Sequence, residues 1–285
     1  EAYPVCSSRS IGTTAFGREI EAMAIGSGGR TVLFTAAHHA NEWITATVLL
    51  KFAEELSRAI LEKGEVYGIP ANLFEENCQI FLVPMVDPDG VDLVTGGIAR
   101  GSIQWEQAKR LSNNCPSVPF PNGWKANLLG VDLNLQYPAG WLQAREIKFS
   151  QGYTRPGPRD YVGKAPLTQR ESRALADFTN YLDPALILAY HTQGEQIYWK
   201  YDDVDVPGAL ALGQEFARLS GYSLEETPYA SGFAGYKDWF IKVWRRPGFT
   251  IEAGLGENPL PISQFDTIYA KNLGILTTAA LGLPA

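Results

Sequence analysis

Short apolar runs rich in β-branched residues alternate along this chain with longer amphipathic stretches, and this alternation constrains the fold most. The strand candidates are Glu19–Ile25, Thr31–Ala37, Gln79–Val86, Ala185–Tyr190 and Phe249–Ala253. The helix candidates are Glu42–Glu62, Thr168–Leu182, Gly208–Ser220, Gly235–Val243 and Ile262–Leu281. Strands that alternate with helices predict an α/β fold in which helices cover both faces of a sheet.

The 285 residues carry no internal repeat and no flexible linker, so we expect one domain over residues 1–285. The connections are long enough for parallel strand pairs, which place functional sites at the carboxyl ends of the strands. Two segments look irregular, Asp87–Asn134 and Tyr137–Lys164, and the first contains one short helix candidate, Gln104–Leu111. Irregular segments of this length usually form walls or lids of a site.

Charge and apolar content exclude several partners. The net charge is −7, which argues against nucleic acid or an anionic membrane as the main partner. No apolar run reaches the ~18–20 residues that span a bilayer. Three cysteines, without a CxxC pair, do not make a zinc ribbon; Cys78 and Cys115 could pair in an oxidising compartment, which the sequence leaves undecided.

Only three histidines are present, His38, His39 and His191. His39 and Glu42 lie three residues apart after an apolar run, and His191 ends another apolar run. If both runs are parallel strands, these side chains meet at one edge of the sheet. Two imidazoles and a carboxylate form a catalytic zinc site. Alternatively, each histidine is an ordinary hydrogen-bonded residue at a strand end, which is the interpretation we adopt for His38.

Two carboxylates complete this hypothesis. Glu252 ends the last apolar run, where it can act as the base that takes a proton from water and delivers it to a leaving amine. Asp132 is a candidate to accept the free ring N–H of a metal-binding histidine. Taken alone, a glutamate at a strand end is more often a solvated residue or a cap, and an aspartate such as Asp132 is more often a turn residue.

In this order the motifs resemble those of the zinc carboxypeptidase family over almost the whole chain. The matching segments are Ile11-Gly-Thr-Thr-Ala-Phe-Gly-Arg18, His39-Ala-Asn-Glu-Trp43, Asp87-Pro-Asp-Gly90, Gly130-Val-Asp-Leu-Asn134, His191 and Thr250-Ile-Glu252. The resemblance implies a mixed, mostly parallel sheet, one Zn²⁺ bound by His39, Glu42 and His191, catalysis by Glu252, and Asn134 in the motif that binds a substrate carboxylate.

Within the family, the chain most resembles the bacterial γ-D-glutamyl-L-diamino acid endopeptidases, which cut peptidoglycan stem peptides. The segments that carry this likeness are His39-Ala-Asn-Glu-Trp-Ile-Thr45, Trp124-Lys-Ala-Asn127, Val131-Asp-Leu-Asn-Leu-Gln-Tyr-Pro138 and His191-Thr-Gln-Gly-Glu-Gln-Ile-Tyr-Trp199. The implied partner is a peptidoglycan peptide or muropeptide. A wall substrate favours a secreted, wall-associated or spore-associated protein, and both a cytoplasmic location and a wall-binding domain before Glu1 stay open.

Three positions depart from the family pattern. Leu135 occupies the place of the arginine that clamps a terminal carboxylate, which favours an endopeptidase over an exopeptidase. The alternative is that Arg100 or Arg145 supplies the clamp. Lys125 is nearest to the family's oxyanion-stabilising arginine, and Tyr229 is nearest to its mobile substrate-capping tyrosine.

Competing functions are a general metallocarboxypeptidase, an aspartoacylase-like amidohydrolase on the same fold, and a non-catalytic wall-binding module. The intact set of His39, Glu42, His191 and Glu252 argues against the last of these.

Overall fold

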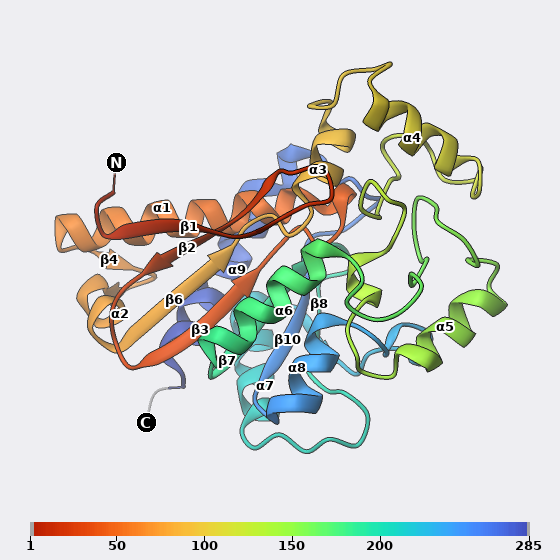
Figure 1. Cartoon of the computed structure of the whole chain (residues 1–285). Coiled ribbons are helices and arrows are strands. Elements are labelled where there is room, and N and C mark those ends of the chain that lie inside the picture. The colour runs from red at the N-terminus through yellow and green to blue at the C-terminus, as the bar shows by residue number, and fades with distance from the viewer. Residues whose placement is uncertain (1–2, 284–285) are drawn as a thin grey trace.

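The computed structural model describes residues 3–283 and is built around an eight-stranded sheet in the order β1-β2-β6-β3-β7-β10-β8-β9 (Figure 1). Strands β6, β3, β7 and β10 are parallel, β1, β2 and β6 pair in antiparallel fashion, and β8 is antiparallel to β10. The predicted mixed, mostly parallel sheet is therefore confirmed. The strands are β1 (Cys6–Thr13), β2 (Glu19–Ile25), β3 (Arg30–Thr35), β6 (Cys78–Val83), β7 (Leu186–His191), β8 (Gln196–Tyr198), β9 (Ser223–Glu225) and β10 (Gly248–Glu252), with β4 (Glu65–Val66) and β5 (Ile69–Pro70) in a separate hairpin.

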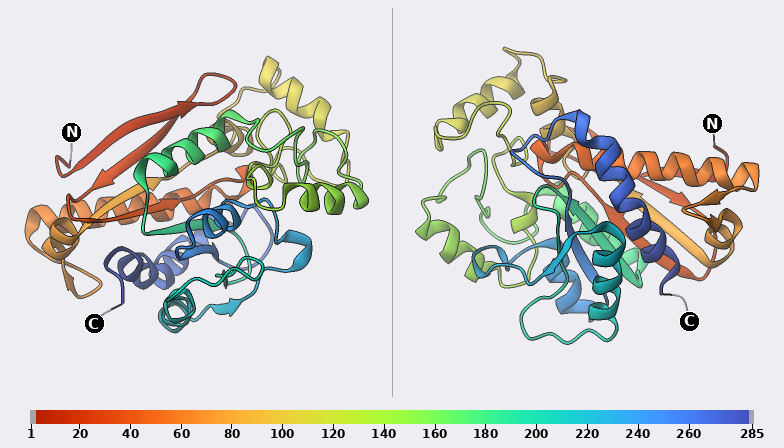
Figure 2. Two further views of the ribbon diagram at one scale, coloured as in Figure 1. Left: turned by 60° about the horizontal axis from the view of Figure 1, so that its bottom comes forward. Right: turned by 180° about the vertical axis from the view of Figure 1, so that it is seen from behind.

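Helices cover both faces of the sheet, as the alternating pattern predicts. On one face lie α6 (Arg170–Leu182) and α8 (Tyr236–Trp244), and on the other lie α1 (Ile44–Glu62), α7 (Ala209–Ser220) and α9 (Phe265–Leu281) (Figure 2). The short helix α2 (Ala71–Asn77) packs beside α1 and α9. Among residues 3–283 no helix combines the length and the apolar character that crossing a bilayer requires.

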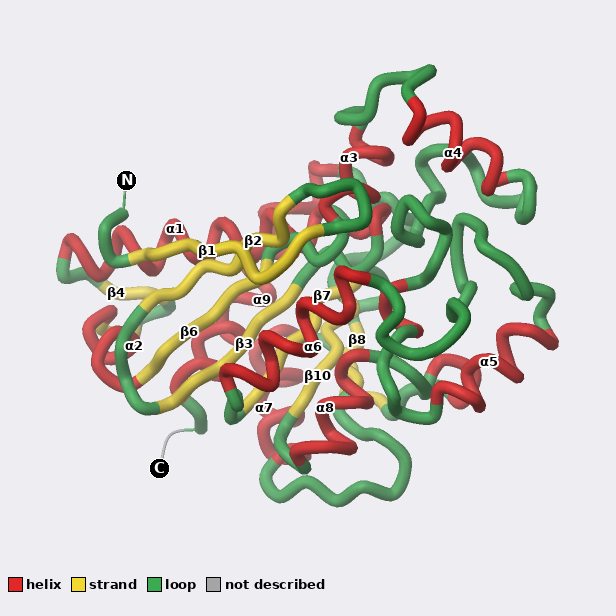
Figure 3. The backbone as a smooth tube through the Cα atoms, in the orientation of Figure 1, coloured by secondary structure: helices red, strands yellow, loops and turns green. Residues whose placement is uncertain are grey.

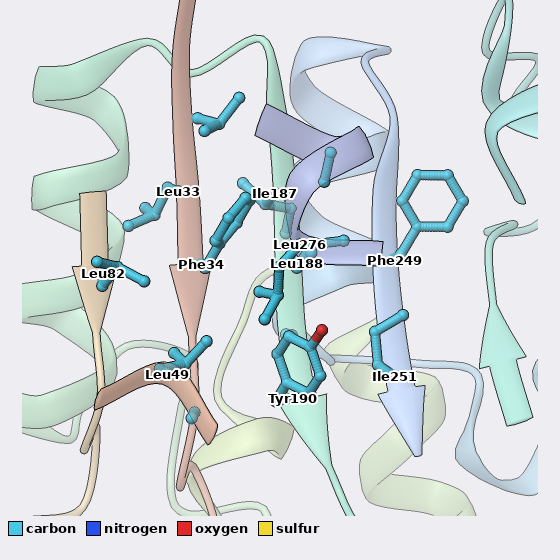
Figure 4. Packing of buried hydrophobic residues seen from close by; sticks show 14 of the residues in the cluster. Leu33, Phe34, Leu49, Leu82, Ile187, Leu188, Tyr190, Phe249, Ile251 and Leu276 are labelled. Atoms are coloured by element: carbon cyan, nitrogen blue, oxygen red, sulfur yellow. The ribbon is translucent and has the colours of Figure 1, made fainter. Parts of the chain in front are cut away.

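The central strands are buried on both faces, which is why the sequence shows them as continuous apolar runs. Every residue of β7 is buried, and Leu188 belongs to the same apolar cluster as Phe34 of β3 and Leu276 of α9 (Figure 4). Burying one such side chain stabilises the fold by about 1.5–3 kcal/mol. A sheet held rigidly in this way gives the residues at its strand ends fixed positions.

The carboxyl ends of β3 and β6 run into a region made mostly of loops, which also holds α4 (Ile103–Ser112) and α5 (Trp141–Ser150) (Figure 3). The helix expected at Gln104–Leu111 is confirmed as α4. The prediction that the two long segments are otherwise irregular is wrong in two places, because α3 (Pro88–Thr95) and α5 form there. Asp87 caps α3 by accepting a hydrogen bond of 3.1 Å from the Gly90 backbone N–H. A capped helix of this length can form without the apolar periodicity by which helices are recognised in a sequence.

Two further expectations are corrected. The first helix begins at Ile44 rather than at Glu42, which instead closes the 3₁₀ turn η1 (Ala40–Glu42). Cys78 and Cys115 are both free thiols, so the pairing considered from the sequence does not occur. Strands β1, β8 and β9 were also unexpected, because a short or largely exposed strand needs no apolar run.

Candidate active site and metal centre

The carboxyl ends of three neighbouring strands bring the predicted site residues together. His39 follows β3 after residues 36–38, and His191 and Glu252 are the last residues of β7 and β10. The parallel register pairs Glu252 directly with His191. Neighbouring strands lie about 4.8 Å apart, so the fold places these two side chains side by side.

A tight turn, rather than a helix, positions Glu42 beside His39. His39 has an extended backbone, and the 3₁₀ turn η1 begins directly after it. The Glu42 backbone N–H donates to the His39 carbonyl oxygen at 3.1 Å, and the Thr45 hydroxyl donates to the Glu42 carbonyl oxygen at 2.7 Å. These local hydrogen bonds turn the Glu42 carboxylate back toward the imidazole.

The side chains of His39, Glu42 and His191 converge beside this turn, and each offers an atom that can bind a metal ion. One oxygen of Glu42 lies 2.9 Å from Nδ1 of His39, the other lies 2.9 Å from Nδ1 of His191, and the two Nδ1 atoms are 3.1 Å apart. All three residues are buried, and they form the one candidate metal-ligand cluster found within residues 3–283. Two imidazoles and one carboxylate fit the ligand set of a catalytic zinc site.

Asp132 supports His39 from behind, as the sequence predicts. Because Nδ1 of His39 faces Glu42, its Nε2–H is free to donate to Asp132 Oδ1, at 3.0 Å. Burial lowers the pKa of His39, but Glu42 and Asp132 outweigh it and raise that pKa above its usual value. Burial would raise the pKa of Asp132, yet His39 holds it well below the usual range. The surplus of negative charge around His39 suits a cation.

His38 turns away from these ligands. Its Nε2 lies 3.3 Å from the Tyr137 hydroxyl, and its ring stacks on His191 with the centroids 5.5 Å apart. Burial, together with the neighbouring histidines, lowers the pKa of His38 well below its usual value. A neutral His38 therefore packs beneath the ligands.

Glu252 and Lys125 complete the polar lining around the metal ligands. Both residues line the same pocket, whose volume is about 220 Å³. Removal from water and the nearby Glu42 carboxylate raise the pKa of Glu252 to about 8. Burial lowers the pKa of Lys125, but Asp132 and Glu42 outweigh it and raise that pKa. The pocket thus holds a carboxyl group and a cation beside the three metal ligands.

Asn134 and Leu135 lie in the 3₁₀ turn η2 (Leu133–Leu135), at the side of the pocket. The Asn134 side-chain oxygen accepts a hydrogen bond of 2.9 Å from the Tyr236 backbone N–H, which ties η2 to the start of α8. Leu135 is buried in a small apolar cluster with Ala144, Val162 and Ala234. Leu135 therefore contributes an apolar surface to the pocket and carries no charge.

Known proteins share this arrangement of motifs. The profile of the family described as zinc carboxypeptidase matches residues 1–273 of the chain. The chain belongs to the zinc carboxypeptidase family. As a member it is a zinc metallopeptidase, and the triad of His39, Glu42 and His191 fits the zinc ion that the family uses.

Two sequence relatives and one structure illustrate the range of this family. The chain is 43% identical over 274 residues to "Gamma-D-glutamyl-L-diamino acid endopeptidase 1" of Lysinibacillus sphaericus, covering 96% of this chain and 67% of that protein. It is 26% identical to carboxypeptidase B of Bos taurus, covering 86% and 57% of the two chains. The crystal structure of thrombin activatable fibrinolysis inhibitor superposes with a TM-score of 0.73 at 16% identity, covering 99% and 71%, and this likeness shows the shared fold.

Tyr229 lies outside the pocket that the metal ligands line. It belongs to the short turn η3 (Tyr229–Ser231), its side chain is 73% exposed, and its ring contacts Phe233 edge-on with the centroids 5.2 Å apart. Ser231 of the same turn lines the catalytic pocket, while Tyr229 lines a neighbouring one. The structure thus brings the turn to the site but not the tyrosine ring.

The proposed substitutes for a carboxylate clamp also lie elsewhere. The Arg100 guanidinium lies over Trp105 at 5.6 Å from the ring centroid, and Arg145 lies over Phe149 at 4.8 Å. Neither arginine lines the pocket.

Sequence reasoning missed most of the charged residues that do line the pocket. Sequence reasoning gave no specific role to Arg159, Asp160, Lys237, Asp238 or Lys148. Lys148 pairs with Asp160 at 2.7 Å, and Lys237 pairs with Asp238 at 2.7 Å. The one local signal for Lys148 was its position four residues after Ala144, on the same face of α5.

Proposed function

We propose that this zinc carboxypeptidase-family enzyme hydrolyses the γ-D-glutamyl–diamino acid bond of peptidoglycan stem peptides. The observation that carries the proposal is the 43% identity with the endopeptidase of Lysinibacillus sphaericus, whose name states this activity. The apolar character of position 135 supports it, because Leu135 cannot clamp a terminal carboxylate as the arginine of a carboxypeptidase does at this position. The same absence of a cation at this position argues against a general metallocarboxypeptidase.

The chemistry assigned to each residue follows from its position. His39, Glu42 and His191 would hold the zinc ion, which when bound supplies Lewis acidity for peptide hydrolysis. Glu252 accepts a proton from the attacking water on a side-chain oxygen and delivers it to the nitrogen of the leaving diamino acid. Lys125 stabilises the negative charge that develops on the carbonyl oxygen of the γ-glutamyl group.

The pKa of Glu252 is matched to this role. Burial and Glu42 raise it, whereas Lys125 and His39 act in the opposite direction. A carboxyl group whose pKa lies near neutrality both accepts and releases a proton at working pH. In the proposed reaction, Glu252 would act first as the base and then as the acid.

Asn134 and Tyr229 are the proposed substrate-binding residues. The Asn134 amide lines the pocket, with its nitrogen 3.4 Å from His191 Nε2, and η2 fixes its orientation. Tyr229 is highly exposed, so its ring can cover a bound peptide only after rotating from its contact with Phe233.

Mass spectrometry of the products from L-Ala-γ-D-Glu-meso-diaminopimelate, with and without a C-terminal D-Ala, tests the proposal. We expect release of L-Ala-D-Glu from both peptides, and no release from the Glu252→Gln protein. Parallel assays use ordinary L-peptides for a carboxypeptidase and N-acyl amino acids for an amidohydrolase. Efficient removal of C-terminal L-residues, or hydrolysis of the N-acyl amino acids without cleavage of the wall peptides, would overturn it.

A further inference from the structure

We infer that Lys148, assisted by Arg159, binds a carboxylate of the substrate and thereby sets which peptides are cleaved. The inference rests on the proposed function and names the groups that recognise its substrate. It follows from where α5 places Lys148, from the balance of charges around the pocket, and from the hydrogen bonds that these charges already make.

Helix α5 carries Lys148 to the pocket beside Leu135. Ala144 and Lys148 are four residues apart and so lie on one face of the helix. Ala144 packs in the apolar cluster with Leu135, and Lys148, only 9% exposed, lines the catalytic pocket together with Leu135. A lysine is rarely buried to this extent unless it is paired, so its position demands negative charge nearby.

The cation Lys237, by contrast, is already satisfied by the protein. Its ammonium donates to the Lys200 carbonyl oxygen at 2.6 Å and to the Thr227 hydroxyl at 3.1 Å, and it pairs with Asp238 at 2.7 Å. An ammonium group has three hydrogens, so these three acceptors use them all. The Lys237–Asp238 pair is neutral as a unit and has no donor left for a ligand.

The other charged residues that line the pocket carry more positive than negative charge. The cations are Lys125, Lys148 and Arg159, and the acids, apart from the metal ligand Glu42 and the catalytic Glu252, are Asp132 and Asp160. Asp132 is already engaged by His39 at 3.0 Å. Lys148 and Arg159 both pair with Asp160, Lys125 has no ion-pair partner among the described residues, and an anion from outside the chain would balance this surplus of positive charge.

Asp160 holds two of these cations side by side. It pairs with Lys148 through one oxygen and with the Arg159 Nε–H through the other. Within residues 3–283, Asp160 is the one acid paired with Lys148, which leaves two of its three hydrogens for another acceptor. The two terminal nitrogens of Arg159 are likewise outside this pair. Together these donors form a seat for one carboxylate, a group with two acceptor oxygens.

The proposed substrate carries suitable carboxylates close to the scissile bond. One lies on the α-carbon of the γ-linked D-Glu, and the others lie on the two amino-acid centres of the diamino acid. All share the same chemistry, so the inference is a carboxylate seat, and the experiment decides which carboxylate occupies it.

The test compares four peptides that differ by one carboxylate at a time. The parent is L-Ala-γ-D-Glu-meso-diaminopimelate, and the others carry an α-carboxamide on D-Glu, a carboxamide on the L-centre, or L-Lys in place of meso-diaminopimelate, which removes the carboxylate of the D-centre. Values of kcat/KM are measured for the wild type, Lys148→Met, Lys148→Arg and the control Lys109→Met, which removes an exposed lysine of α4.

We expect Lys148→Met to lower kcat/KM on the parent by about tenfold to a hundredfold, the range for losing a charge-assisted hydrogen bond. The loss should nearly vanish on the one peptide that lacks the bound carboxylate. Lys148→Arg should retain most of the discrimination, and Lys109→Met should match the wild type on every peptide.

A loss of the same size on all four peptides, or no loss on any, would overturn the inference, because Lys148 would then act only through stability or not at all. Zinc content and thermal unfolding show whether Lys148→Met is folded. If Lys148→Met is not folded, kcat/KM on the same four peptides is measured for Arg159→Met, which changes a partly exposed side chain. A wild type that cleaves none of the peptides refutes the proposed function, whereas cleavage without this coupling refutes the carboxylate seat alone.

Discussion

Replacing Asp132 with asparagine tests how the protein holds its metal ligand His39. The His39 Nε2–H donates to Asp132 Oδ1 over 3.0 Å, and both residues are buried. Asparagine keeps an oxygen in this place and can still accept the hydrogen bond of 3.1 Å that Asp132 receives from the Asn134 backbone N–H. The substitution therefore removes the charge and spares the fold of η2.

The expected size of the effect follows from this geometry. A hydrogen bond to a charged group contributes about 1.5–3 kcal/mol, and one between neutral groups about 0.5–1.5 kcal/mol. The difference of roughly 1–1.5 kcal/mol corresponds to about a tenfold loss of zinc affinity. Loss of such supporting carboxylates typically weakens metal binding by about tenfold to a hundredfold, which agrees with this estimate.

Competition between the metal-free protein and a chelator measures the zinc affinity. The matched control is Asp177→Asn, which removes an exposed carboxylate of α6 and should bind zinc like the wild type. Equal zinc affinities of Asp132→Asn and the wild type would refute the argument that Asp132 supports His39.

Three further predictions concern the ligands, the base and the charged residues of the pocket. His191→Ala should lose zinc and activity together, and full zinc occupancy in that protein would contradict the ligand assignment. Glu252→Gln should keep zinc and fold but lose activity by about 10²- to 10⁴-fold, and near-normal turnover would mean that another residue is the base. Burial raises the pKa of Asp160, but the surrounding cations outweigh it and lower that pKa in the folded protein. Asp160 therefore stabilises the fold at pH values above the unfolded pKa of about 3.9. This contribution is lost as the pH falls through the folded pKa. The stability difference between the wild type and Asp160→Asn, measured by urea unfolding of the metal-free proteins, should therefore be larger at pH 7 than at pH 3, and a constant difference would contradict it.

The sequence by itself determined the fold class and the metal triad. Parallel strands buried on both faces have to be apolar throughout, so β3, β6, β7 and β10 stand out as runs whose ends locate His191 and Glu252. The spacing of His39 and Glu42 is likewise a local property, because one short turn brings both side chains to the same place. These features depend on neighbours in the chain.

Only the tertiary structure decided what surrounds the metal centre. The strand order sets Glu252 against His191, and helix α5 carries Lys148 toward Asp160, with no local pattern to announce either contact. The same folding buries Leu135 in an apolar cluster while it leaves Tyr229 outside the pocket. Charged residues on loops follow no sequence periodicity, so the sequence does not indicate which of their side chains point into the pocket. Their positions follow from long-range packing, which forms only when the whole sheet is assembled.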